Sequence, residues 1–120
     1  MKKIAALLGA LAVALGALGA HMLRDLLDTN VIDSFQTATM YQLFHAIALV
    51  ALPTEPRFLW TARCWGVGIL FFSGSIYLLV FDELMGMNLS FIGPITPIGG
   101  LFLIAGWILL WFAYANKTSH

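Results

Sequence analysis

Charge is the first property that this sequence has little of. Only 10% of its 120 residues are Asp, Glu, Lys or Arg, against about a quarter in soluble proteins. So few charges cannot cover the surface of a water-soluble globule. The six basic and six acidic residues cancel to a net charge of zero, and a domain that binds nucleic acid would carry a strongly basic face instead. We therefore expect no nucleic-acid partner.

Residues with recognisable site chemistry are also scarce. A single cysteine, Cys64, excludes an intrachain disulfide. The motifs HExxH, CxxC and GxSxG and a phosphate-binding glycine loop are absent from the sequence. His21 and His45 are a poor pair of haem ligands, because helical rise places them about 10 Å apart in depth. We expect no metal, no cofactor and no enzymatic activity.

Apolar residues are what the sequence has in abundance, at 61% of the chain. They form four long runs, each long enough to cross a bilayer as a helix. We predict one all-α domain over residues 1–120, a four-helix transmembrane bundle with spans at 4–23, 34–52, 60–81 and 97–115. The first run follows two lysines, as in a signal peptide. Three further runs come after it, so we interpret it as an uncleaved span.

Local signals predict where two of these helices begin. Asp33 and Gln36 are spaced as in a capping box, which predicts a helix start near Ser34. Thr96 and Pro97 are typical of the N-cap and the first helical position. We therefore expect the second helix to begin near Ser34 and the fourth helix at Pro97.

The distribution of Lys and Arg predicts the orientation. Arg24 is the only basic residue in the loops on one side of the predicted bundle. The other side holds Lys2, Lys3, Arg57, Arg63 and Lys117. Under the positive-inside rule, this asymmetry places both termini in the cytoplasm. Trp107, Trp111 and Tyr114 are residue types that gather at membrane–water interfaces, so we expect them to mark the interface near the end of the fourth span.

Polar side chains interrupt only the second apolar run. Tyr41, Gln42 and His45 are three or four residues apart and share one helix face. Such a stripe is costly in lipid, so we expect it to face other helices, with His45 close to Ser73. The candidate polar intramembrane site consists of Tyr41, Gln42, His45, Ser73 and Tyr77. Two interpretations remain open: hydrogen bonds that only fix helix register, or a proton relay or small-ligand site, since histidine titrates near neutral pH.

Glycines recur at helical spacing in the first and fourth runs. Small residues let helices approach closely in membranes. The glycines that we expect at helix–helix contacts are Gly9, Gly16, Gly19, Gly99 and Gly106. Leucine at Gly16 or Gly106 should push two helices apart.

Several segments together resemble a known family. These segments are Gly16–His21, Tyr41–Ala46, Phe72–Tyr77, Thr96–Gly100 and Gly106–Trp107. In this order and spacing they resemble the YgdD/YwdK-type family of small bacterial inner-membrane proteins, classed as a domain of unknown function. The resemblance extends from about Gly9 to Trp107. It implies a four-helix, multi-pass protein of the bacterial inner (plasma) membrane, and it supplies no catalytic or binding residues.

Two hypotheses about function follow. The first is a non-enzymatic membrane component that packs in the lipid bilayer against a second copy of itself or another membrane protein. The alternative is a minimal transporter or channel subunit that uses the stripe of Tyr41, Gln42 and His45 for protons or a small polar ligand. Transporters usually rely on repeated halves, and no inverted repeat is evident in this sequence, so the alternative would require oligomerisation.

Overall fold

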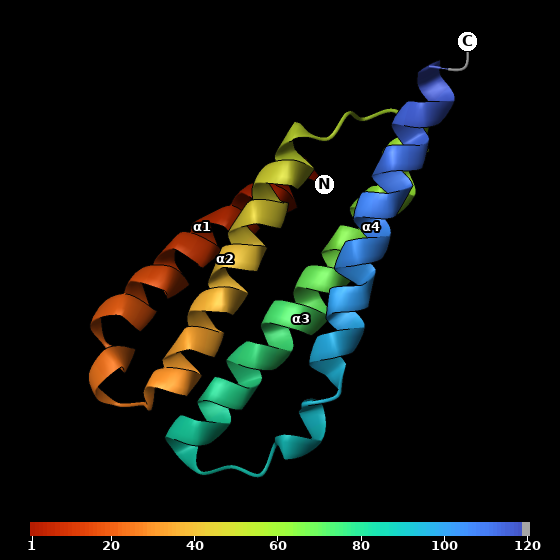
Figure 1. Cartoon of the computed structure of the whole chain (residues 1–120). Coiled ribbons are helices and arrows are strands. Elements are labelled where there is room, and N and C mark those ends of the chain that lie inside the picture. The colour runs from red at the N-terminus through yellow and green to blue at the C-terminus, as the bar shows by residue number, and fades with distance from the viewer. Residues whose placement is uncertain (119–120) are drawn as a thin grey trace.

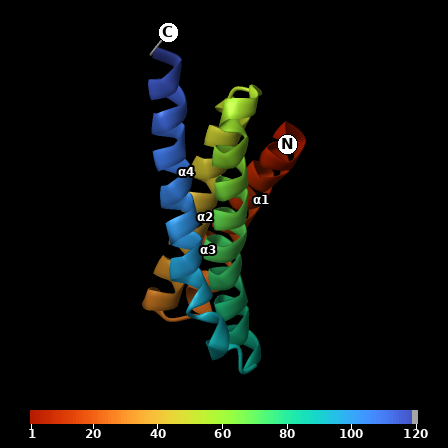
Figure 2. The ribbon, with the colours of Figure 1, turned by 90° about the vertical axis from the view of Figure 1, so that its right-hand side faces the viewer.

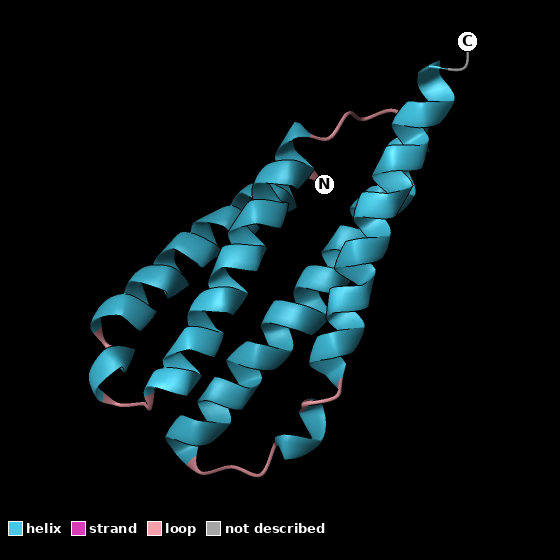
Figure 3. Cartoon of the chain, viewed as in Figure 1, coloured by secondary structure: helices cyan, strands magenta, loops and turns pink. Residues whose placement is uncertain are grey.

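Four long helices make up the computed structural model, which describes residues 1–118 (Figures 1 and 3). Their bounds are α1 Lys2–His21, α2 Thr29–Ala51, α3 Leu59–Met85 and α4 Ile95–Thr118. The connections contain short 3₁₀ helices, η1 Leu23–Asp25, η2 Pro56–Phe58 and η3 Ser90–Ile92. The prediction of an all-α, four-helix fold is confirmed.

The helices form two antiparallel hairpins, α1–α2 and α3–α4, that meet along α2 and α3. Figure 2 shows α1 and α4 on opposite sides of this central pair. The start of α1 and the end of α4 lie at the same end of an elongated molecule of 55 × 26 × 20 Å. We call this end, which also holds η2, the basic end, because Lys2, Lys3, Arg57 and Arg63 lie there.

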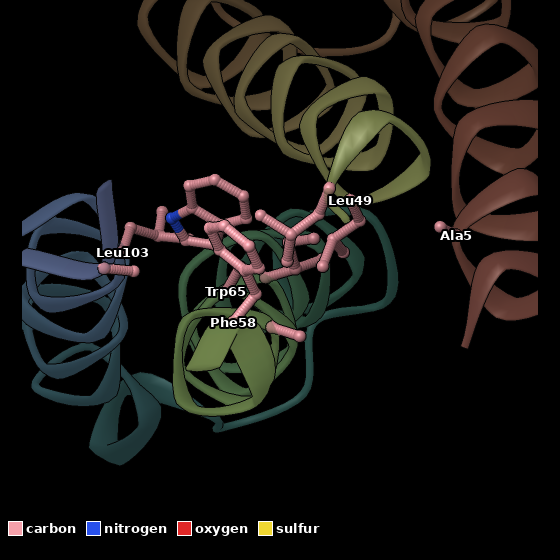
Figure 4. Close-up of a cluster of buried hydrophobic side chains, with 9 residues drawn as sticks. Ala5, Leu49, Phe58, Trp65 and Leu103 are labelled. Atoms are coloured by element: carbon pink, nitrogen blue, oxygen red, sulfur yellow. The ribbon is translucent and has the colours of Figure 1, made fainter. Parts of the chain in front are cut away.

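Two apolar clusters fill the space between the helices. Towards the basic end, Leu49, Phe58, Trp65 and Leu103 come together from α2, η2, α3 and α4 (Figure 4). Towards the opposite end, the cluster consists of Leu23, Phe35, Ala38, Ile76 and Val80. On α2, the residues between these clusters include the polar stripe, so the polar site lies between two apolar layers.

The prediction that α2 starts near Ser34 is wrong. The helix begins at Thr29, after Asp28, whose carbonyl accepts the N–H groups of Val31 and Ile32. The residues interpreted as a capping box therefore lie inside the helix. Packing accounts for the difference, because Val31 packs against the apolar cluster that contains Phe35, Ile76 and Val80. That burial stabilises the start of the helix.

The start of α4 and the end of α3 also differ from the prediction. Helix α4 begins at Ile95, two residues before Pro97, which is tolerated because the first N–H groups of a helix lack intrahelical partners. The Thr96 hydroxyl does not cap the helix but pairs with the Ser75 hydroxyl of α3. Helix α3 continues to Met85 and ends at Gly86, in a left-handed conformation with φ 68° that suits glycine.

Three of the four described helices are long and apolar enough to cross a membrane. These candidate spans are Lys2–His21, Pro56–Met85 and Ser90–Asn116. Helix α2 is not among them. Its 23 residues include the polar stripe and, near its start, Asn30, Asp33 and Ser34, which lower its mean hydropathy. It is also the helix that lies between α1 and α3.

The glycines expected at helix contacts all face a neighbouring helix, at two different spacings. A Cβ atom on Gly99 would lie 2.2 Å from the Phe72 nitrogen, and one on Gly106 would lie 2.4 Å from Trp65 Cδ1. Gly19 is similarly tight against Phe35. Gly9 and Gly16 have ordinary room, with the nearest atoms at 3.8 Å. The earlier pairing of Gly16 with Gly106 therefore needs correcting, because only Gly106 lies in a close contact.

Gly99→Ala should destabilise the protein much more than Gly16→Ala. The new methyl group at Gly99 meets α3 backbone, which cannot move aside, and overpacking of this kind costs about 1–3 kcal/mol. At Gly16 the methyl group fits, and alanine favours the helix by up to about 1 kcal/mol. Thermal unfolding of both variants in one mild detergent, followed by circular dichroism, measures the difference. Equal midpoints would contradict the close α3–α4 approach.

Candidate functional site: a polar and aromatic layer between the hairpins

Gln42 joins three helices. Its side chain is 3% exposed. The carboxamide Nε2 donates to the Leu8 carbonyl of α1 at 2.7 Å, and Oε1 accepts from the Tyr77 hydroxyl of α3 at 2.6 Å. Because a carboxamide carries a donor and an acceptor on one planar group, this single side chain of α2 ties both of its neighbours.

His45 is hydrogen-bonded at both ring nitrogens and is 6% exposed. Nδ1 lies 2.7 Å from the Tyr41 carbonyl, which can only accept, so Nδ1 carries the proton. Trp107 Nε1 donates to Nε2 at 2.9 Å, so Nε2 is bare. The two bonds together define the neutral tautomer. A second proton on Nε2 would face the indole N–H and break that bond.

Aromatic rings enclose His45. The rings of Trp65 and Trp107 both lie 5.8 Å from the imidazole in edge-on arrangements. Their own centroids are 4.7 Å apart. Trp65 is fully buried over Gly106, and its Nε1 has no hydrogen-bond partner among the described residues. Packing therefore fixes the position of Trp65, whose ring in turn contacts both the His45 imidazole and the Trp107 indole.

Tyr41 does not face the interior as expected. It is 41% exposed, and its ring stacks on Phe72 of α3 at 5.0 Å. Its only role towards the imidazole is through its backbone carbonyl and a ring contact at 6.3 Å. The stripe is therefore narrower than predicted, with Gln42 and His45 buried and Tyr41 at its edge.

The prediction that His45 lies close to Ser73 is also wrong. Ser73 is buried, but its hydroxyl donates to the Ala38 carbonyl at 2.7 Å, two turns before His45 on α2. The five candidate residues thus separate into a Gln42–Tyr77 pair, His45 with an indole of α4, the Ser73 bond, and Tyr41 at the edge. The first three connect α2 with the α3–α4 hairpin.

Trp107 is the residue that sequence analysis assigned wrongly. We expected it at the interface, yet it lies in the middle of α4 against the imidazole. Gly99 and Gly106 face α3, and their seven-residue spacing was the sequence signal that could have shown which way Trp107 points. The residue after Gly106 is turned by about 100°, towards the side of α4 that α2 approaches.

The described residues contain no group of three or more His, Cys, Asp and Glu side chains placed to hold a metal ion. The polar atoms of Gln42, His45, Ser73 and Tyr77 that are described above each have a protein partner. Geometrically, the layer is arranged to hold helices in register.

Comparison with known proteins places this fold in a family. Residues 15–100 match the family described as "Protein of unknown function (DUF423)". The chain is 39% identical to a UPF0382 membrane protein of Haemophilus influenzae, over 97% of this chain and 92% of that protein. It is 34% identical to the UPF0382 inner membrane protein YgdD of Escherichia coli K12, over 88% of this chain and 82% of that protein.

A eukaryotic relative is similar too. The UPF0382 membrane protein of Schizosaccharomyces pombe is 38% identical over 87% of this chain and 92% of its own length. No solved structure matches the chain. The family match and these relatives agree with the resemblance carried by the sequence segments, and the chain belongs to the DUF423 family of membrane proteins, whose function is unknown.

Proposed function

We propose that this protein is a non-enzymatic, multi-pass component of the bacterial inner membrane that binds a second copy of itself or another membrane protein. The observation that carries the non-enzymatic part is the pairing of the polar layer. Both nitrogens of His45 and both ends of the Gln42 carboxamide are already bonded to protein atoms. A relay or ligand site needs a polar atom that can exchange partners, whereas these bonds connect helices, apart from the His45–Tyr41 bond within α2.

We also propose four membrane crossings, with both termini in the cytoplasm. Helix α2 is less apolar than the others, but Gln42 and His45 are buried against neighbouring helices rather than exposed to lipid. Polar groups that are paired inside a bundle are compatible with a membrane-spanning helix. The inner-membrane location is supported by the printed name of the Escherichia coli relative.

A topology experiment tests this arrangement. A reporter fused after His120, which lies outside the described residues, should be active only in the cytoplasm. A tag placed in the 87–89 loop should be labelled only from outside, because the basic end is retained inside. If α2 does not cross, the three remaining crossings would place the two termini on opposite sides of the membrane. A reporter before Met1 that is inactive in the cytoplasm, while the fusion after His120 is active there, would therefore contradict the four-crossing proposal.

Gln42→Leu should lower the free energy of unfolding, and Gln36→Leu should not. The first variant removes the hydrogen-bond partner of the Tyr77 hydroxyl on α3 and that of the Leu8 carbonyl on α1. Each interhelical hydrogen bond in a membrane contributes about 0.6–1.7 kcal/mol. Gln36 is an exposed residue of the same helix, so it is a matched control. Unfolding by a denaturing detergent, followed by tryptophan fluorescence, measures both variants.

The transporter alternative predicts a different outcome, which a proton-flux measurement tests. Purified protein in vesicles containing a pH-sensitive dye should show no proton flux above empty vesicles. Flux through the unmodified protein that is lost in His45→Phe, while the variant stays folded, would overturn the structural assignment and favour a relay.

The partner-binding part of the proposal rests on a groove between α1 and α2. Its volume is about 300 Å³, and small residues form most of its wall: Ala5, Ala6, Gly9, Ala46 and Ala51, with Ile47 and Val50. Small residues allow a further helix to approach closely, which is how helices associate in lipid. Gly19, Gly99 and Gly106 are in tight contacts within the protein, whereas Gly9 and Gly16 have room. Of these two predicted packing glycines, Gly9 is the one that lines the groove.

Gly9→Leu should weaken self-association or partner binding without unfolding the protein. A Cβ atom at Gly9 would make an ordinary van der Waals contact, at 3.8 Å from Ala46 Cβ, and the rest of the side chain would occupy the groove of about 300 Å³. Leu101→Ala, a change on the exposed face of α4, serves as the control. Mass measurement of the complex in mild detergent should show a smaller assembly for Gly9→Leu only. A monomeric unmodified protein that retains no partner would contradict the proposal.

A further inference from the structure

A second cavity lies between the hairpins at the basic end. It has a volume of about 340 Å³ and is bounded by the start of α1, the end of α2, the loop before η2, and the start of α3. Its buried wall is apolar and includes Leu49, Leu52, Phe58 and Ala62. A polar metabolite would lose its hydration there without gaining partners, so the wall suits an alkyl chain.

The charged side chains that line this cavity are those of Lys2 and Glu55. Lys2 lines it, and its ammonium group donates to the Leu52 carbonyl at 2.8 Å and to the Val50 carbonyl. An ammonium group has three N–H donors, so one donor remains after these two bonds. Arg57 pairs with Glu55 at 2.6 Å, and both side chains are substantially exposed.

The mouth lies at the level where phospholipid headgroups are expected. Trp60 is exposed, and the Arg63 guanidinium lies 4.9 Å from its ring. Exposed tryptophan next to a basic side chain is typical of the membrane–water boundary. The cavity therefore extends from the headgroup region towards the hydrocarbon, between helices that diverge at this end (Figures 1 and 2).

We propose that this cavity is a binding site for one anionic phospholipid, with an acyl chain against Leu49, Leu52 and Phe58 and the phosphate at Lys2. The apolar wall accommodates the chain. Glu55 is already paired with Arg57, so the Lys2 ammonium group is the charged group of the lining that selects the negative headgroup. Basic pockets between transmembrane helices are a known means of binding anionic lipids. The assignment does not depend on the partner groove, because the two linings have no residue in common.

The test measures binding of phosphatidylglycerol and phosphatidylcholine with identical acyl chains to the purified full chain, by native mass spectrometry. The unmodified protein should prefer phosphatidylglycerol. Lys2→Gln keeps an N–H donor but removes the charge, and should reduce that preference about fivefold, the effect of about 1 kcal/mol for one basic side chain near anionic lipid. Lys3→Gln is the matched control, because it removes the same charge from a residue that does not line the cavity.

A second variant tests the apolar part of the site. Ala62→Phe places a ring in the cavity and should reduce binding of both lipids, while Ala14→Phe on the exposed part of α1 should leave binding unchanged. Circular dichroism shows whether each variant is folded. If Ala62→Phe does not fold, the comparison of Lys2→Gln with Lys3→Gln decides alone. The proposal is overturned if the two lysine variants lose preference equally, or if a folded Ala62→Phe binds phosphatidylglycerol as well as the unmodified protein.

Discussion

The carboxamide of Gln42 is the interaction on which the arrangement of α1 depends most. Helix α1 packs along α2, and Gln42 continues that contact through its bond to Tyr77 on α3. In hydrocarbon, a polar group that loses its partner finds no water to replace it. A leucine at this position would pack equally well but would leave the tyrosine hydroxyl without its acceptor. One residue therefore couples the α1–α2 hairpin internally and also to the other hairpin.

Contacts within the hairpins and between them use different chemistry. The close glycine contacts are all within a hairpin: Gly19 meets Phe35 between α1 and α2, while Gly99 and Gly106 meet α3 from α4. Between the hairpins, directional hydrogen bonds are added to the apolar clusters, namely Gln42–Tyr77, Ser73 with the Ala38 carbonyl, and His45–Trp107. Glycine lets backbones approach closely over a long surface, whereas directional bonds fix how two preformed hairpins align.

Local sequence patterns predicted the helices and the polar stripe, but not the pairing of side chains. Hydropathy and spacing depend only on neighbours along one helix. They were therefore enough to predict the four helices, the burial of Gln42 and His45, and the helix faces that carry the glycines. The partner of His45 depends on which helix lies beside α2, and that is set by the whole arrangement. Tyr41 and Gln42 differ by about 100° around the helix, so a small rotation decides which of them is exposed. The start of α2 was missed because burial of Phe35 outweighed a local capping pattern.

The position of the polar bonds explains why lipid would enter at one end. These bonds join the hairpins near the middle of α2 and α3, from Ala38 to His45 on α2. Towards the basic end, the hairpins meet through apolar side chains such as Leu49 and Phe58. Lipid chains are as apolar as leucine and can replace such contacts at little cost, but they cannot replace a hydrogen bond. Separation of the hairpins is therefore easiest at the basic end, where the cavity lies.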